Sequence, residues 1–461
     1  MNSNSSLVTK FHFPPAMLAV CVFFFSICNA HGEAPSAGLQ AFGPYLYEPK
    51  PDDPAFAKFN PQLAPLPGPL LLRKGDRLAI IGDSITEQKL YSRIIETYLT
   101  VCVPQLEITA RQYGWSGERA EGFLQRMDQD CLRFSPTVAT LAYGMNDSKY
   151  RPFDTVNGDW YRDHYSAVVQ KLKASGANVV VGSPGCAGKI ADWVKSRSGT
   201  LDEHNLHLCT LRDIALQLAQ KQQVAFADIF WPMYTQQVLA AKKYGTAKKP
   251  YRIAGKDGIH PGGAGHLLMA YSFLRALGLD GEIATIKVDL KKNEASVSAG
   301  HRVDQFKDGT LSLTSTRYPF CATDPVDEDT SIRSGMTLVP FDQNLNRFTL
   351  QITGLDAAMA KISWGNQSRI FDRNALVTGI NLATAFQENP FSVAFQNVDA
   401  AVAAKQAFET YQVKSVFHGK EGRADIESAV ARTERDRGPL VDAITAARVP
   451  VAHKLIIELM Q

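Results

Sequence analysis

A serine and a histidine that stand far apart in the sequence have the residue types needed for nucleophilic hydrolysis of an ester. Ser84 ends the stretch LAIIGDS, and His260 lies in the stretch KDGIHPGG, three residues after Asp257. A serine nucleophile needs a base that takes its proton and a carboxylate that orients this base. His260 is the natural base, since its ordinary pKa is near 6.5, and Asp257 can meet it within one tight loop. Ser84 is therefore a candidate nucleophile.

Ser84 also has a second interpretation as a helix cap. Ser84 and Glu87 stand three residues apart, which is the spacing of a capping box at a helix start. A Ser84 hydroxyl that accepted from the Glu87 N–H would not point toward His260. We therefore expect a structure to show Ser84 turned toward His260, with Asp83 or Thr86 in the capping role.

A reacting ester also needs hydrogen-bond donors that face the developing oxyanion. The sequence offers the backbone N–H of Ser84 at a helix start, the backbone N–H of Gly117 and the side-chain amide of Asn146. Trp115, beside Gly117, and Tyr143 are candidate substrate contacts, because an aromatic ring offers a flat apolar face to a ligand. Ordinary packing is the alternative for both rings.

The elements that must position these residues alternate between apolar strands and helical patterns. Helices are predicted over 160–174, 206–222 and 262–277, and a further amphipathic helix follows Ser84. Strands are predicted over 77–81, 106–114, 137–144, 178–183 and 224–230. Near-continuous apolar strands that alternate with helices indicate an α/β fold with a parallel sheet covered on both faces. The candidate residues follow strand ends, where an open α/β sheet places its ligand site.

Four short stretches carry a resemblance to a known family. GDSI, WSG, GMND and DGIHP resemble, in this order, the four motif blocks of the SGNH (GDSL-type) hydrolase superfamily over roughly residues 75–278. The resemblance implies a flavodoxin-like three-layer α/β/α sheet and esterase chemistry without a metal or another cofactor. The second block often has Asn five residues before its Gly; here Gln112 stands there, which leaves Gly117 in place but leaves the local hydrogen bonding open.

The matching positions receive roles from the same resemblance. Ser84 becomes the nucleophile, His260 the base and Asp257 the carboxylate that orients it. The Ser84 N–H, the Gly117 N–H and the Asn146 side chain become the oxyanion hole. His204 and His207 form an H-x-x-H pair, but no carboxylate pattern completes a metal site around them.

The chain of 461 residues divides into regions with different sequence patterns. It is 45% hydrophobic and 21% charged, with a formal net charge of +3, so nothing in its charge indicates nucleic acid as a partner. We predict an extended N-terminal segment over 31–72 that wraps the next domain and a hydrolase domain over 73–279. A small antiparallel β-rich module over 280–390 and a helical C-terminal region over 391–461 follow.

Residues 1–30 have the pattern of a secretory signal peptide. Lys10 and His12 precede an apolar run that ends at Ala30. This predicts a secreted or periplasmic protein without a stable membrane span after cleavage; a retained anchor helix is the alternative.

Export makes disulfides possible among the five cysteines that follow the signal. Cys102 with Cys131 and Cys186 with Cys209 are the candidate pairs, and Cys321 is left over. The alternative is that all five thiols are free and buried.

Export and Trp115 together favour a secreted serine esterase that hydrolyses O-acetyl esters, with an acetylated polysaccharide as the candidate substrate. Two alternatives stay open. One is a lipid acyl hydrolase with the same mechanism. The other is a non-catalytic secreted protein that binds glycans through its β-rich module.

Overall fold

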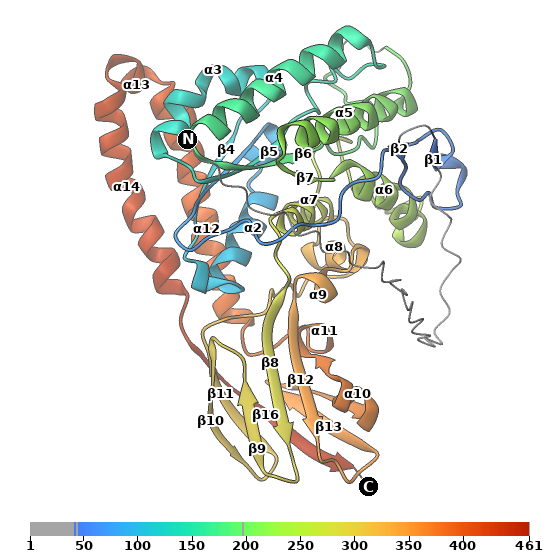
Figure 1. The fold of residues 1–461 in the computed structure, drawn as a ribbon, viewed down its shortest axis with the longest axis vertical. Coiled ribbons are helices and arrows are strands. Elements are labelled where there is room, and N and C mark those ends of the chain that lie inside the picture. Colours follow the sequence, from blue (N-terminus) through green and yellow to red (C-terminus); the bar gives the residue numbers. More distant parts are fainter. Residues whose placement is uncertain (1–40, 43–44, 196–197, 461) are drawn as a thin grey trace, which may run out of the picture. The chain divides into compact units, whose positions relative to one another are not determined.

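A five-stranded parallel sheet forms the centre of the hydrolase domain (Figure 1). The structure is a computed structural model that describes residues 41–42, 45–195 and 198–460; the predicted signal peptide over 1–30 lies outside the described residues. The strands are β3 (Arg77–Gly82), β4 (Thr109–Gly114), β5 (Val138–Ala142), β6 (Asn178–Gly182) and β7 (Ala225–Ala227). Their order β4-β3-β5-β6-β7 is the flavodoxin-like order. The predicted fold class is therefore confirmed.

Helices cover both faces of this sheet, and successive strand residues point into different cores. In β3, Ile80 belongs to one hydrophobic core and Ile81 to the other, as the period of two in a strand requires. Both residues are fully buried. The helices are α1 (Ser84–Glu87), α2 (Tyr91–Val101), α3 (Ala120–Asp130), α4 (Thr155–Ala174), α5 (Leu201–Gln222), α6 (Phe230–Tyr244) and α7 (Gly263–Ala276).

The two cores also explain why the candidate disulfide between Cys102 and Cys131 does not form. Cys102 packs in the core with α2 and α7, whereas Cys131 packs in the core with α3 and α4 on the other face of the sheet. Cys186 and Cys209 share a core but are not bonded to each other. All five cysteines in the described part of the chain are free and buried, so both candidate pairs are corrected to free thiols.

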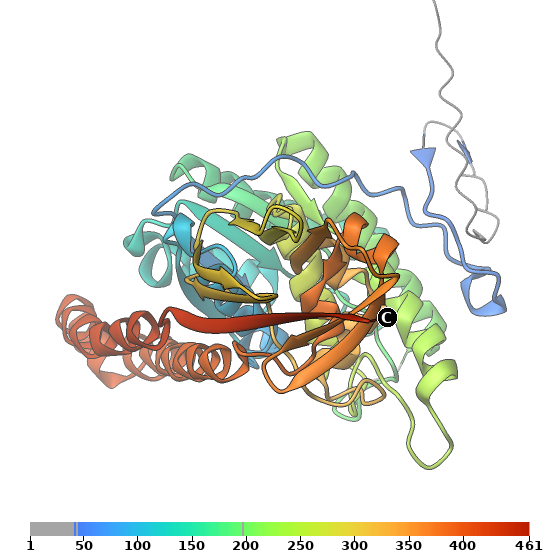
Figure 2. The ribbon, with the colours of Figure 1, turned by 90° about the horizontal axis from the view of Figure 1, so that it is seen from below.

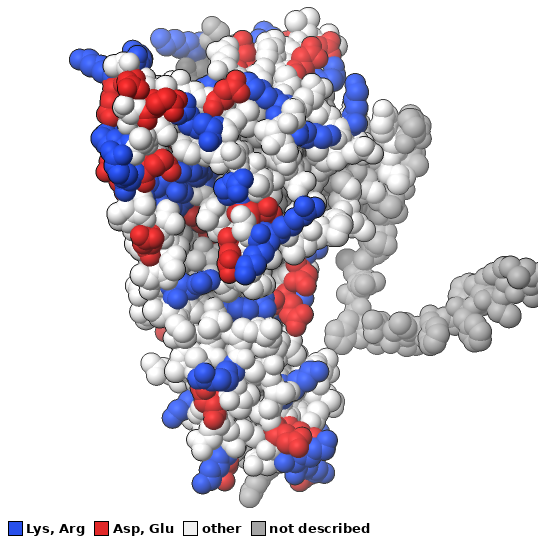
Figure 3. Space-filling model, turned by 60° about the vertical axis from the view of Figure 1, so that its left-hand side comes forward, with Lys and Arg blue, Asp and Glu red and all other residues white. Residues whose placement is uncertain are grey.

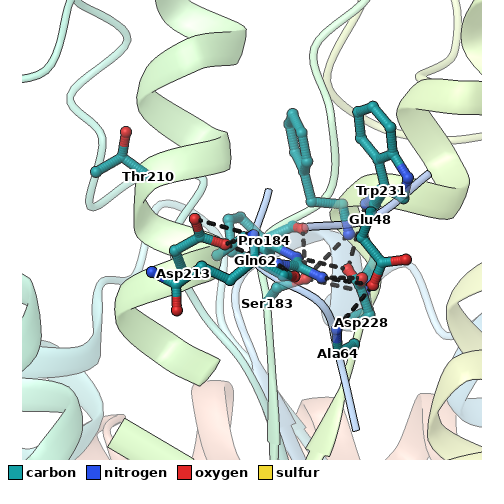
Figure 4. Close-up of polar contacts among 12 residues, drawn as sticks. Glu48, Gln62, Ala64, Ser183, Pro184, Thr210, Asp213, Asp228 and Trp231 are labelled. Carbon is teal, nitrogen blue, oxygen red and sulfur yellow. Dashed lines mark hydrogen bonds and ion pairs between the residues drawn. The ribbon is translucent and has the colours of Figure 1, made fainter. Parts of the chain in front are cut away.

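The N-terminal segment is fixed to the hydrolase domain by a buried arginine. Arg212 of α5 donates to Asp213 and Asp228 of its own domain and to Glu48 and the Gln62 carbonyl of the N-terminal segment (Figure 4). The Gln62 N–H in turn donates to Asp213 over 3.1 Å. A buried cation with several acceptors thus holds the described part of this segment, at Glu48 and Gln62, against the domain.

The β-rich module consists of two sheets. One has the order β15-β12-β8-β9, and β8 pairs with β12 in parallel, so the module is not purely antiparallel. The other has the order β10-β11-β16-β13-β14. The strands are β8 (Glu282–Asp289), β9 (Glu294–Val297), β10 (His301–Lys307), β11 (Thr310–Ser315), β12 (Arg347–Thr353), β13 (Met359–Trp364), β14 (Gln367–Asp372) and β15 (Ile380–Asn381). Short helices between them are α8 (Ile332–Leu338), α9 (Phe341–Asn344), α10 (Arg373–Thr378) and α11 (Leu382–Ala385).

The C-terminal region is helical except for its last element. It contains α12 (Ser392–Tyr411), the π-helical turn η4 (Gln412–Phe417), α13 (Lys420–Ala424) and α14 (Ile426–Ala447). The final strand β16 (Val451–Met460) differs from the predicted helical region. It fills the centre of the second sheet, between β11 and β13 (Figure 2). The chain end therefore belongs to the β-rich module.

The C-terminal helices complete the exposed edge of the central sheet. In β4, the edge strand, the Ala110 carbonyl accepts from Lys405 Nζ over 2.6 Å, and the Gln112 N–H donates to Glu409 Oε2 over 3.2 Å. Side chains of α12 thus satisfy polar groups that an edge strand otherwise leaves to solvent.

On the face drawn in Figure 3, basic and acidic side chains lie interspersed. Arg432 and Glu421 form one of the exposed ion pairs of the protein, over 2.8 Å. Within the described ranges, no helix is long and apolar enough to span a membrane.

Candidate active site

The structure brings Ser84, His260 and Asp257 into one hydrogen-bonded row. Ser84 Oγ lies 2.8 Å from His260 Nε2, and His260 Nδ1 lies 2.7 Å from Asp257 Oδ2. Ser84 follows β3, the strand at which the strand order reverses, and such switch points are where doubly wound sheets bind ligands. The side chains of His260 and Asp257 are 25% and 35% exposed, so the row is open to a substrate.

Ser84 is the first residue of α1 but does not cap it. The capping oxygen is Asp83 Oδ1, which accepts from the Ile85 N–H over 2.9 Å. The Glu87 N–H donates to the Asp83 carbonyl instead of to Ser84. The expected geometry is therefore present, with the serine hydroxyl turned toward His260 and Asp83 at the N-cap.

Asp257 is held in an orientation that suits the histidine. Its Oδ1 accepts from the Ile259 and His260 N–H groups over 2.9 and 2.8 Å, which leaves Oδ2 for the imidazole. Desolvation raises the pKa of Asp257, but the hydrogen bonds from the two backbone N–H groups and from His260 outweigh it and hold the pKa below its ordinary value. The carboxylate is therefore ionised at neutral pH.

Three donors that the sequence assigned to an oxyanion come from different loops. Within the described residues, neither the Ser84 N–H nor the Gly117 N–H donates to an acceptor of the protein. Gly117 has a φ of +75°, a left-handed conformation that glycine adopts without strain. Asn146 Nδ2 lies 3.2 Å from Asp83 Oδ2 and 3.1 Å from the Glu118 carbonyl.

Tyr150 fixes the orientation of the Asn146 amide. Its hydroxyl donates to Asn146 Oδ1 over 2.7 Å, so the amide nitrogen must face the other way, toward Asp83.

Burial raises the pKa of Asp83 to about 7 and that of Asp147 to about 6. Asp147 accepts from the Gly144 and Ala120 N–H groups and ties the ends of β5 and α3 together.

The departure at Gln112 is accommodated locally. Gln112 Oε1 accepts from the Gly114 N–H over 2.8 Å, and its amide nitrogen donates to Thr410 of α12. Gly114 itself is required for close packing, because a Cβ there would lie 2.2 Å from the Glu87 backbone nitrogen of α1. Gln112 therefore links the second block to the C-terminal region.

The two aromatic candidates lie in different surroundings. Tyr143 is 1% exposed and donates from its hydroxyl to Glu118 over 2.6 Å, so it is a core side chain and not a surface for a substrate. Trp115 is partly exposed, with Arg126 5.1 Å and Lys414 5.2 Å from its ring. Two cationic side chains of the protein thus already lie close to the Trp115 ring.

Trp193 is an aromatic residue at the site that sequence reasoning missed. It is 47% exposed, and its ring centroid lies 5.6 Å from that of His260 and 6.4 Å from that of Tyr150. It belongs to the loop between β6 and α5, on the same rim of the sheet as Ser84. An aromatic residue in this rim loop is the signal that could have found it.

His204 and His207, the H-x-x-H pair, are buried in α5. His204 Nε2 lies 3.0 Å from Ser148 Oγ, and His207 Nε2 lies 3.3 Å from Asn157 Nδ2. No group of three metal-ligating side chains is found in the residues that the structure describes.

Comparisons with known proteins find relatives of the central domain. Residues 80–268 match the model of the GDSL-like lipase/acylhydrolase family. An acetylxylan esterase from Geobacillus stearothermophilus is 23% identical over 229 residues, which are 45% of this chain and 95% of that protein. A solved structure of a catalytic mutant of the same kind of enzyme from that organism covers 45% of this chain and 96% of its own, with 19% identity and a TM-score of 0.37.

The fold of most of the chain recurs in another solved structure. A gut microbial diltiazem-metabolizing enzyme covers 86% of this chain and 99% of its own, with 21% identity and a TM-score of 0.63. This likeness concerns the fold and extends well beyond the hydrolase domain.

The central domain is thus a flavodoxin-like α/β domain with a serine–histidine–aspartate row at its switch point. The chain carries a domain of the SGNH (GDSL-type) hydrolase superfamily and is an ester-hydrolysing enzyme.

Proposed function

We propose that the protein is a serine esterase that removes O-acetyl groups from carbohydrate through an acyl-enzyme on Ser84. The observation that supports this proposal most directly is the row from Ser84 Oγ through His260 to Asp257, with distances of 2.8 and 2.7 Å. These are the contacts that a serine nucleophile, its base and an orienting carboxylate need.

The first half of the reaction forms the acyl-enzyme. His260 Nε2 takes the Ser84 proton while Oγ attacks the ester carbonyl carbon, and Asp257 stabilises the imidazolium that results. The negative oxygen of the tetrahedral intermediate accepts from the N–H groups of Ser84 and Gly117 and from Asn146 Nδ2. Both existing bonds of Asn146 Nδ2 exceed 3.0 Å, so an oxyanion competes well for the same hydrogens. His260 then returns the proton to the alcohol that leaves.

The second half releases the acid. Water attacks the acyl carbon, His260 takes a proton from this water, and the same oxyanion donors act again. The proton returns to Ser84 Oγ when the bond between Oγ and the acyl carbon breaks. The products are the free carboxylic acid and the original enzyme.

A carbohydrate as the leaving alcohol is supported by Trp193. Its half-exposed ring lies beside His260, the residue that protonates the leaving group, and a flat aromatic face suits a sugar ring. The relationship to an acetylxylan esterase points to the same class of substrate. We place the enzyme outside the cytoplasm on the pattern of residues 1–30 alone.

Two variants test the proposal. Ser84→Ala should abolish turnover of p-nitrophenyl acetate and of acetylated xylo-oligosaccharides while the protein stays folded; undiminished hydrolysis would exclude Ser84 as the nucleophile.

Trp193→Ala should raise the KM for the oligosaccharides about three- to tenfold and leave p-nitrophenyl acetate unaffected. Tyr45→Ala, which removes another exposed ring (46%), is the control. Equal effects of Trp193→Ala on both esters would argue against a sugar platform, and faster turnover of long acyl chains would favour a lipid substrate.

A further inference from the structure

The loop that carries Gly117 is bound by a glutamate of α1. The Ser116 N–H and hydroxyl both donate to Glu87 Oε2, over 2.5 and 2.7 Å. Gly117 follows Ser116 directly and is itself solvent-exposed, and a Cβ built on it would meet nothing within 4 Å. Glu87, which holds Ser116, is therefore one of the groups that fix the position of the Gly117 N–H.

Glu87 is in turn held by a lysine of the C-terminal region. Lys414 Nζ, from η4, donates to Glu87 Oε1 over 2.7 Å and to Oε2 over 2.9 Å. The Lys414 and Glu87 side chains are only 28% and 19% exposed. Desolvation raises the pKa of Glu87, but the hydrogen bonds from Lys414 and Ser116 outweigh it and hold the pKa below its ordinary value. The Glu87 carboxylate is thus ionised, and its contact with Lys414 is partly shielded from solvent, unlike an ordinary surface ion pair.

The turn that presents Lys414 is anchored on the hydrolase domain at further points. His418, just after η4, lies 2.8 Å from the buried Asp130 of α3, and its ring meets Trp115 edge-on at 5.0 Å. Phe417 stacks on Phe134 at 6.3 Å. The backbone that carries Lys414 is therefore fixed on the hydrolase domain. The hydrogen bonds between α12 and the edge strand β4 add to this anchoring.

We infer that the turn η4 of the C-terminal region is part of the catalytic apparatus, with Lys414 and Glu87 as positioning residues that hold the Gly117 N–H where the oxyanion forms. The inference rests on the proposed function and deepens it. A residue that aims an oxyanion donor acts on the transition state more than on the bound ester. Loss of the Lys414 contact should therefore lower kcat and leave KM nearly unchanged.

The test compares three variants with p-nitrophenyl acetate as the substrate. Lys414→Met should lower kcat roughly tenfold, because small displacements of catalytic groups are costly, with KM unchanged within about twofold. Lys414→Arg, which keeps a cation that can pair with Glu87, should restore most of kcat. Arg432→Met, which removes an exposed ion pair of the same helical region, is the matched control and should behave like the wild type.

The outcomes separate this inference from the esterase proposal. If the wild type turns over the ester and Ser84→Ala does not, the esterase proposal stands whatever the result for the Lys414 variants. With that in hand, a kcat of Lys414→Met equal to that of Arg432→Met, or a change confined to KM, overturns the inference.

If Lys414→Met does not fold, the variant Glu87→Gln provides the same test. Its amide oxygen can still accept from Ser116 but no longer forms an ion pair with Lys414. A lowered kcat supports the inference, and an unchanged kcat overturns it.

Discussion

Replacing Asp257 with Asn should disable the base without changing the shape of the loop. In Asp257→Asn, Oδ1 can still accept from the Ile259 and His260 N–H groups, whereas an NH₂ group takes the place of Oδ2, 2.7 Å from His260 Nδ1. Because NH₂ only donates, Nδ1 must lose its proton, and the proton moves to Nε2. Nε2 then faces Ser84 Oγ at 2.8 Å as a donor and cannot take its proton.

The expected loss in kcat is about 10⁴-fold, the scale of a wrong histidine tautomer in a serine hydrolase. This corresponds to about 5.5 kcal/mol of transition-state stabilisation. The assay is p-nitrophenolate release from p-nitrophenyl acetate, with circular dichroism to confirm the fold.

Asp289→Asn is the matched control, since Asp289 Oδ1 likewise accepts from the N–H groups two and three residues later. It should keep full activity. A loss of less than about tenfold in folded Asp257→Asn would refute the assignment of Asp257 as the orienting carboxylate.

Three further predictions concern the oxyanion, acid stability and the thiols. Asn146→Ala should lower kcat about 10²- to 10³-fold, and a loss that appears only in KM would speak against an oxyanion role. Burial lowers the pKa of His453 in the folded protein to about 3. As the pH falls below 6.5, His453 therefore takes up a proton in the unfolded chain but not in the folded protein. Folding stability is lost toward acid for this reason. Between pH 7 and pH 5, the wild type should lose about 2 kcal/mol more of its unfolding free energy than His453→Gln in urea titrations; equal losses would contradict the lowered pKa. The five buried cysteines should react with a thiol reagent only after unfolding, and rapid labelling of the native protein would contradict their burial.

The central sheet could be predicted because most of its strands are apolar on both faces. The run 77–81 becomes β3 almost unchanged, and the amphipathic segment after Ser84 becomes α2. The last strand β16 could not be predicted in the same way. It belongs to the sheet only through its pairing with β11 and β13, which precede it by many residues and flank it on both sides. A pattern that depends on distant partners carries little local signal.

The same contrast between local and distant signals applies to the residues of the active site. Ser84, His260 and Asp257 stand in motifs that the sequence displays, and the structure brings their side chains together. Tyr150, Trp193 and Lys414 carry no motif, because their contacts depend on where loops and the C-terminal helices pack. Local sequence thus indicated the reacting groups but not the residues that orient and surround them.

The most direct test of the central claim is peptide mass spectrometry of the protein after inactivation by an organophosphate ester, a reagent that phosphorylates activated serines. The account predicts one adduct, on Ser84, that forms in step with the loss of esterase activity and is absent from Asp257→Asn over the same time. Inactivation with the adduct on another residue, or with Ser84 unmodified, would contradict it.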